Sequence, residues 1–287
     1  MANSANHSSN NRQVQQILPS RSTSDGDGVR IQRTLGQHRH DMDPFLMLDE
    51  IRSVDSADYV GGFPPHPHRG IETLTYMLAG GFVHEDNMGH REELRDGGAQ
   101  WMSSGRGVIH SELPLIHEGL LHGFQLWINL PAAQKMREPA YKQATREELP
   151  EATLDNGTVL RSFGGTWEIA GKTLVSPLNN FSANARALDI NLPANTALQI
   201  AVPHDDTVLA YVFDGTLVTE NKNIERQNVV RYGSGSTVEL QAGNKGARCL
   251  LLTGTPLGEP IAQHGPFVMN TEAEMQQAIE DYRAGNF

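Results

Sequence analysis

The feature that most constrains the fold is a succession of short strand-like runs separated by Gly, Asp or Asn. In the first half of the chain these runs cover residues 29–34, 73–78, 81–85, 100–103 and 121–130. In the second half they cover residues 159–163, 186–192, 207–213, 229–232, 237–240 and 248–253. Short runs with turn residues between them are typical of antiparallel sandwiches and barrels. The 28 glycines and 15 prolines supply the turns that so many strands need. We therefore expect an all-β fold.

The two halves of the chain look like copies of one unit. At 287 residues the chain is long enough for two domains of ordinary size. Residues 76–83 (YMLAGGFV) match residues 211–218 (YVFDGTLV), and each segment is typical of a strand, a glycine turn and a second strand, which predicts a hairpin. A charged stretch at residues 132–155 is the best linker candidate.

These observations predict three parts. An Asn/Ser-rich tail, residues 1–12, is expected to be disordered, and two barrels are expected over residues 13–145 and 146–287. A short helix closes the second part. Thr271 and Glu274 have the spacing of a capping box, and apolar residues recur after them at helical spacing. We expect this helix to support a barrel.

Composition excludes several classes of protein. The formal net charge is −11 and the chain has no Lys/Arg cluster, so direct binding to nucleic acid is not expected, and anchoring to anionic lipid is disfavoured. No apolar run is long enough to span a membrane, and the polar N-terminus lacks the apolar stretch of a secretory signal. The sequence therefore predicts a cytoplasmic protein, with the nucleus open in a eukaryote. The single cysteine, Cys249, lies in an apolar run and is interpreted as a small buried hydrophobe.

Two pairs of metal-ligating residue types carry the functional signal. His66 and His68 are two residues apart, so on a strand both imidazoles face the same way. About 40 residues later His110 and Glu112 have the same spacing. Each pair lies in an apolar or glycine context, where an unpaired polar side chain is costly. Although a lone histidine is more often a surface residue, two such pairs predict one metal ion held by nitrogen and oxygen donors.

Spacing alone leaves the carboxylate ligand open. Glu72 has the same strand parity as His68 and is a second candidate beside Glu112. We favour Glu112 as the ligand and Glu72 as a group next to the ligands or a proton-handling group. The second half lacks an equivalent set, because the positions that correspond to His66 and His68 are Ala201 and Pro203.

Several segments together resemble the pirin family, a branch of the cupin superfamily. They are LMLDE (46–50), FPPHPHRG (63–70), QWM (100–102), GRGVIHSELP (105–114), QLWINL (125–130) and HGPFVMN (264–270). The general cupin pattern expects a glutamate at position 72 and an asparagine at position 114, where this chain has Pro114. Pirins share this departure, and the resemblance implies that the ligands are His66, His68, His110 and Glu112. It also implies a bicupin: two cupin-type antiparallel barrels with one iron in the first and a metal-free second barrel.

The resemblance implies two activities. The favoured one is a quercetin 2,3-dioxygenase-type oxidoreductase that opens a flavonol-like substrate with O₂. The metal would orient the substrate's hydroxyl and carbonyl groups, and Glu112 or Glu72 would accept the hydroxyl proton. The alternative is a redox-responsive co-regulator that binds a transcription factor or a metabolic enzyme without turnover. The residues alone leave the metal open, because such a site binds Cu(II) and Zn(II) well, whereas the resemblance implies Fe(II).

Overall fold

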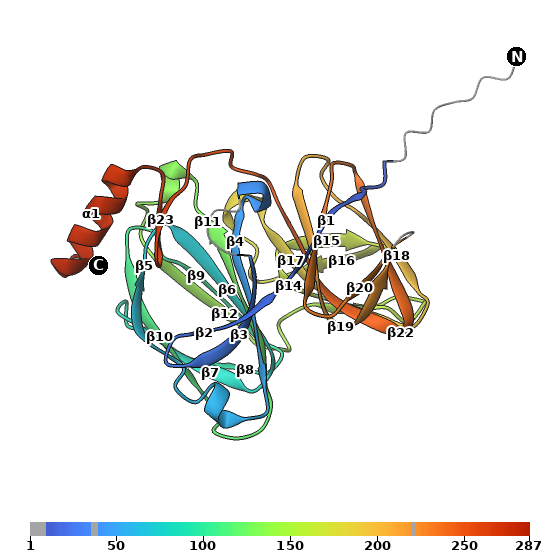
Figure 1. The fold of residues 1–287 in the computed structure, drawn as a ribbon, viewed down its shortest axis with the longest axis horizontal. Helices are drawn as coiled ribbons and strands as arrows, with labels where there is room; N and C mark the ends of the chain where they lie inside the picture. Colours follow the sequence, from blue (N-terminus) through green and yellow to red (C-terminus); the bar gives the residue numbers. More distant parts are fainter. Residues whose placement is uncertain (1–9, 36–39, 220–221) are drawn as a thin grey trace, which may run out of the picture.

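The computed structural model describes residues 10–35, 40–219 and 222–287, and it consists of two β-barrels side by side (Figure 1). The predicted all-β fold, with two cupin-type antiparallel barrels and a short C-terminal helix, is confirmed. Within the described residues, no helix has the length and apolarity needed to cross a membrane.

The first barrel is built from two facing antiparallel sheets. The larger sheet runs in the order β12-β9-β6-β11-β4-β3-β2, and the smaller one in the order β5-β10-β7-β8. The larger sheet consists of β2 (Arg21–Asp25), β3 (Val29–Leu35), β4 (Phe45–Ser53), β6 (Ile71–Ala79), β9 (Ala99–Ser103), β11 (Leu121–Asn129) and β12 (Ala140–Ala144). The smaller sheet consists of β5 (Phe63–His68), β7 (Gly81–Asp86), β8 (Arg91–Arg95) and β10 (Val108–Pro114). Short 3-10 turns lie at His40–Met42, Ser56–Asp58 and Ala132–Gln134.

The second barrel is formed by one long, strongly curved sheet and a small hairpin. Its strands are β1 (Val14–Pro19), β13 (Glu151–Thr153), β14 (Val159–Gly164), β17 (Arg186–Leu192), β18 (Ala197–Ala201), β19 (Thr207–Val218), β20 (Asn223–Glu225), β21 (Asn228–Tyr232) and β22 (Thr237–Gly254). The hairpin consists of β15 (Thr166–Ile169) and β16 (Lys172–Val175), and a 3-10 turn lies at Ser182–Asn184. Aliphatic side chains such as Ile190, Val212 and Leu251 fill the interior of this barrel.

The two barrels share an apolar core along their seam. Leu74, Tyr76 and Phe124 of the first barrel pack with Phe163 and Phe213 of the second in one buried cluster. The rings of Tyr76 and Phe163 stack at 4.3 Å, and the Tyr76 hydroxyl donates to Asp189 at 2.9 Å. Burial of this much apolar surface holds the barrels together as one unit.

Both ends of the described chain cross the expected boundary between the barrels. β1 belongs to residues 13–145 but pairs with β21 of the second barrel, and Arg12 donates to five carbonyls of that barrel. Residues 10–12 are therefore fixed in place, contrary to the disordered tail that we predict, whereas residues 1–9 lie outside the described part. At the other end, β23 (Ala262–His264), β24 (Phe267–Met269) and α1 (Glu272–Arg283) return to the first barrel (Figure 1).

The C-terminal return is fixed by close contacts next to the predicted ligand His68. Arg69 forms a parallel bridge with Phe267, and its guanidinium pairs with Asp281 of α1 at 2.7 Å. Gly70 has φ +81°, and a Cβ there would lie 2.0 Å from the Val268 carbonyl oxygen, so only glycine fits. The capping box that we predict at the start of α1 is present. The helix thus supports the first barrel, although our domain boundaries assign it to the second.

The predicted hairpins at residues 76–83 and 211–218 are wrong. β6 and β7 lie in different sheets, so the first segment turns a corner of the barrel. In the second segment β19 continues through a bulge at Asp214 and Gly215. Gly80 and Gly215 occupy matching positions and both have positive φ, 75° and 63°. The two segments therefore share a glycine corner, which explains their similarity in sequence.

Candidate metal centre

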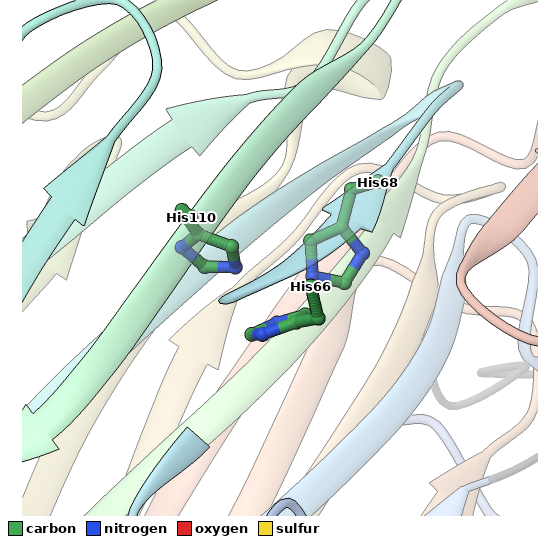
Figure 2. Close-up of side chains that lie close together, drawn as sticks. All are labelled: His66, His68 and His110. Carbon is green, nitrogen blue, oxygen red and sulfur yellow. The ribbon is translucent and has the colours of Figure 1, made fainter. Parts of the chain in front are cut away.

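Three histidines converge from two neighbouring strands of the first barrel. β5 and β10 are antiparallel, and their register places His110 directly opposite His66 and Val108 opposite His68. The ring centroids are separated by 4.8 Å for His66 and His68, 4.4 Å for His66 and His110, and 5.0 Å for His68 and His110. One potential ligand atom from each lies within 4.8 Å of the others (Figure 2). The strand spacing alone predicts this convergence.

One ring nitrogen of His66 and one of His110 have a free lone pair with which to bind a metal. His66 Nδ1 lies 2.8 Å from the Pro64 carbonyl oxygen, so Nδ1 carries the proton and Nε2 keeps a free lone pair. His110 Nε2 is buried without a hydrogen-bond partner in the described structure, and Figure 2 shows this side of the ring directed toward His66 and His68. An orphaned buried nitrogen costs free energy unless a ligand satisfies it. The donor set therefore fits a metal ion.

Burial also keeps these rings neutral. Burial lowers the pKa of His66, and it lowers the pKa of His68 and His110 further, to well below their usual range. Neighbouring histidines act in the same direction on the pKa of His68 and of His110, because a second positive charge is unfavourable nearby. Neutral imidazole is the form that binds metals.

Glu112 lies on the same strand as His110 but is not in the three-histidine cluster. A register shift in the pairing of β10 with β5 separates the two residues. The Glu112 carboxylate accepts hydrogen bonds from Gln100 Nε2 at 2.5 Å, Gln125 Nε2 at 3.1 Å and Thr75 Oγ1 at 3.3 Å. Burial raises the pKa of Glu112 to about 7 against these three hydrogen bonds. Its place as fourth ligand therefore stays a prediction, supported by its position on the wall of the same cavity as His66 and His68.

The structure does not bring Glu72 to the histidines, which corrects its predicted proton-handling role. Neighbouring residues of a strand face opposite sides, and Glu72 shares its side of β6 with Leu74 and Tyr76 of the seam core. Its carboxylate pairs with Arg137 at 2.5 Å and accepts from the Ser182 backbone amide at 3.0 Å. Glu72 thus belongs to the contact between the barrels, which strand parity with His68 did not reveal because the chain turns at Gly70 between β5 and β6.

His66 and His68 line a cavity of about 670 Å³. Its wall includes His66, His68, Glu112 and Gln125, and the Trp127 ring meets His68 edge-on at 5.1 Å. Apolar lining comes from Leu46, Met47, Ile51, Phe63, Pro64, Pro65 and Pro266, and charged lining from Asp25, Asp27, Arg33 and Asp49. A mostly apolar cavity of this size with a few convergent polar groups is typical of a site for a small organic molecule.

Sequence reasoning missed one group of residues beside the cluster. His84 is completely buried, and its Nδ1 lies 3.4 Å from Nδ1 of His110. Asp86 and Tyr141 contact His84 on its other sides. His84 and Asp86 have the same two-residue spacing as the ligand pairs, a signal that their charged surroundings concealed.

Comparison with known proteins places this chain in a family. The Pirin family model matches residues 28–128, and the model of the pirin C-terminal cupin domain matches residues 187–287. A Vibrio cholerae protein named "Putative quercetin 2,3-dioxygenase" is 45% identical over 96% of this chain and 98% of its own length. Human pirin is 37% identical over 92% of this chain and 90% of its own. A crystal structure of quercetin 2,3-dioxygenase from Acinetobacter baumannii superimposes with a TM-score of 0.87 at 31% identity, covering 96% of this chain and 98% of that one.

Proposed function

We propose, from the premise that this chain belongs to the pirin family, that it is an iron(II)-dependent dioxygenase of the quercetin 2,3-dioxygenase type. Its substrate would be a flavonol-like aromatic compound, whose ring is opened with O₂. The observation that carries the proposal is the orphaned Nε2 of His110, which faces His66 and His68 beside a cavity of about 670 Å³. The names of the Vibrio and Acinetobacter relatives support the same activity.

In this proposal four side chains hold the metal. His66, His68 and His110 each donate one ring nitrogen, and Glu112 gives up some of its amide hydrogen bonds to add a carboxylate oxygen. The bound metal supplies Lewis acidity, which orients the substrate's hydroxyl and carbonyl groups and lowers the pKa of the hydroxyl. The ligand chemistry alone would also accept nickel, copper or zinc. The choice of iron therefore rests on the resemblance to the pirin family.

The remaining residues of the cavity would bind the aromatic substrate and move its proton. Trp127 and Met47 offer flat or polarisable apolar surface, and Pro64 and Pro266 contribute further rigid apolar lining. Glu112 would accept the hydroxyl proton on a carboxylate oxygen, because it lies on the wall of the same cavity. Glu72 has no part in this step, since its carboxylate is engaged at the seam between the barrels.

Metal analysis and product analysis test this function. Protein purified without added metal is analysed for its elements and by electron paramagnetic resonance, then mixed with quercetin without oxygen and exposed to air. We expect one metal ion per chain and a ring-opened product. His66→Ala and His110→Ala should lose the metal and keep the fold, because the cores of the barrels do not depend on these rings. His204→Ala, at a histidine that is 65% exposed, is the matched control. Fully metallated protein that yields no ring-opened product would refute the dioxygenase proposal.

The second candidate is a redox-responsive binding protein. One observation favours it: the interior of the second barrel is filled by apolar side chains, which leaves this half of the molecule for packing or for contact with a partner. A pull-down with reduced and with oxidised protein tests it. Equal recovery of partners in both states would count against this candidate.

A further inference from the structure

His84 lies next to His110 of the three-histidine cluster. It is on β7, which pairs with β10 so that His84 is opposite Glu112 and Asp86 is opposite His110. The His84 side chain is 0% exposed, and its ring centroid is 5.2 Å from that of His110. Its Nδ1 faces His110 Nδ1 at 3.4 Å, and its Nε2 faces Asp86 Oδ2 at 3.2 Å. Both ring nitrogens are therefore engaged, so His84 is placed beside the ligands rather than among them.

The hydrogen bonds around His84 determine which ring nitrogens of His84 and His110 carry a proton. Asp86 accepts from the backbone amides of Met88 and His90, at 2.9 and 3.0 Å, and contacts both His84 and the His90 ring. A carboxylate that meets so many donors is an acceptor only, so His84 Nε2 must carry the proton. Neutral His84 then has a bare Nδ1, which accepts from Nδ1–H of His110. The proton of His110 is thereby held on Nδ1, which leaves a lone pair on Nε2, the orphaned atom that faces the other two histidines.

Packing holds His84 in this orientation. The Tyr141 ring on β12 stacks on His84 at 4.4 Å with an interplanar angle of 20°. The Tyr141 hydroxyl lies 3.1 Å from Gln100 Oε1, and Gln100 Nε2 donates to Glu112 at 2.5 Å. One tyrosine therefore braces His84 behind His110 and, through Gln100, also orients Glu112.

We propose that His84 is a positioning residue of the metal centre, which fixes the tautomer and ring orientation in which His110 Nε2 binds the metal. The inference rests on the proposed metal centre and extends it by one residue. Hydrogen bonds from outside a metal's ligand set fix the orientation of ligand histidines, and their loss weakens metal binding by about 10- to 100-fold.

Two substitutions separate the hydrogen bonds of His84 from its packing. His84→Phe keeps a ring against Tyr141 but removes both hydrogen bonds. His84→Gln keeps one acceptor and one donor, on an amide at the end of a flexible chain in place of the ring. His122→Phe is the matched control, because His122 is buried in the same barrel and bonded to Glu50 at 2.9 Å, on the side that faces the second barrel.

The readouts are the affinity for Co(II), measured by chelator competition, the visible spectrum of the Co(II) form, and thermal melting of metal-free protein. We expect His84→Phe to lose about 10- to 100-fold in affinity and to shift the Co(II) spectrum. His84→Gln should recover part of both, and His122→Phe should match the wild type. If His84→Phe does not fold, His84→Ala takes its place, because it also removes both hydrogen bonds. A Co(II) affinity and spectrum in His84→Ala equal to those of the wild type would overturn the inference.

Failure of the inference and failure of the proposed function give different results. Wild-type protein that binds Co(II), together with a His84→Phe variant of equal affinity and unchanged spectrum, overturns the role of His84 and leaves the metal centre standing. Wild-type protein that binds no Co(II) and no Fe(II) overturns both. Loss of affinity in His122→Phe as large as in His84→Phe would also count against the inference, because the effect would then be general to buried histidines.

Discussion

Replacing Glu72 with alanine separates a role in the seam between the barrels from a role in chemistry. The Glu72 side chain is 0% exposed, and its carboxylate binds Arg137 and both the amide and the hydroxyl of Ser182. Ser182 belongs to the second barrel, so Glu72 joins the two halves of the molecule. Alanine leaves the buried Ser182 amide without an acceptor and removes the charge opposite Arg137.

The size of the effect follows from these contacts. Removing one partner of a buried ion pair costs about 3–5 kcal/mol. The Arg137 side chain is 31% exposed and reaches water when its partner is gone, so we expect the lower limit, about 3 kcal/mol. At about 2–4 °C per kcal/mol for domains of 150–250 residues, this lowers the melting temperature by roughly 6–12 °C. Glu72→Gln keeps an acceptor for Ser182 and should lose only about 1 kcal/mol.

The stability that Glu72 contributes should depend on pH, and the direction of this dependence can be tested. Burial raises the pKa of Glu72 above its ordinary value of 4.5, against the opposing effect of Arg137. The folded state therefore holds the proton at a pH where the unfolded state has released it, so this group's contribution to stability is largest in acid and falls as the pH rises through the folded pKa. Glu72→Gln does not titrate. Its stability deficit should accordingly shrink as the pH is raised from 4.5.

Thermal melting and metal content, measured on the same samples, distinguish a role of Glu72 in the seam from a role in the metal centre. We expect Glu72→Ala to melt earlier and to contain as much metal as the wild type. A Glu72→Ala variant that melts at the same temperature as the wild type would refute a role in the seam. A Glu72→Gln variant that keeps its stability but loses turnover would instead identify Glu72 as a catalytic base.

Three further predictions concern other parts of the molecule. Cys249 is fully buried and burial raises the pKa of its thiol, so a disulfide reagent should label it no faster than the second barrel unfolds; rapid labelling of native protein would contradict this. Asp281→Asn removes the ion pair with Arg69, so hydrogen exchange of the α1 amides should accelerate while exchange in β22 stays unchanged. Saturating metal-free protein with Fe(II) at 100 times the dissociation constant should stabilise it by about 2.7 kcal/mol, and a chelator should reverse the gain in a melting experiment.

The strand pattern predicted much of the fold because periodicity and turns are local properties. Residues 186–192 form β17 within the limits that the sequence predicts. The predicted runs 237–240 and 248–253 are instead parts of one strand, β22, which continues through the glycines between them. Pairing over long distances was not predictable. β1 joins β21 more than 200 residues away, and nothing in its own sequence favours that partner over a strand of the first barrel.

The histidine cluster was predictable because a two-residue spacing on a strand determines which side chains share a face. The position of Glu72 was not predictable. Residues two apart share a face only within one continuous strand, and a turn between two strands ends that relation. Gly70, with φ +81°, makes that turn between β5 and β6. The place of His84 beside the cluster was not predictable, because its burial depends on β10 and β12, which approach β7 only in the folded barrel.

The C-terminal return explains why the candidate metal centre belongs to the whole chain rather than to its first barrel. Lys135 is 1% exposed, and its ammonium donates to the Gly70 carbonyl, the Asn129 side chain and the Val268 carbonyl at 2.7–2.9 Å. It therefore ties the loop after His68 to β24. Pro266, just before that strand, lines the cavity beside the histidines. The segment that completes the cavity wall thus arrives only after the chain has built the second barrel, so the seam that Glu72 and the aromatic core hold together is a condition for a complete site.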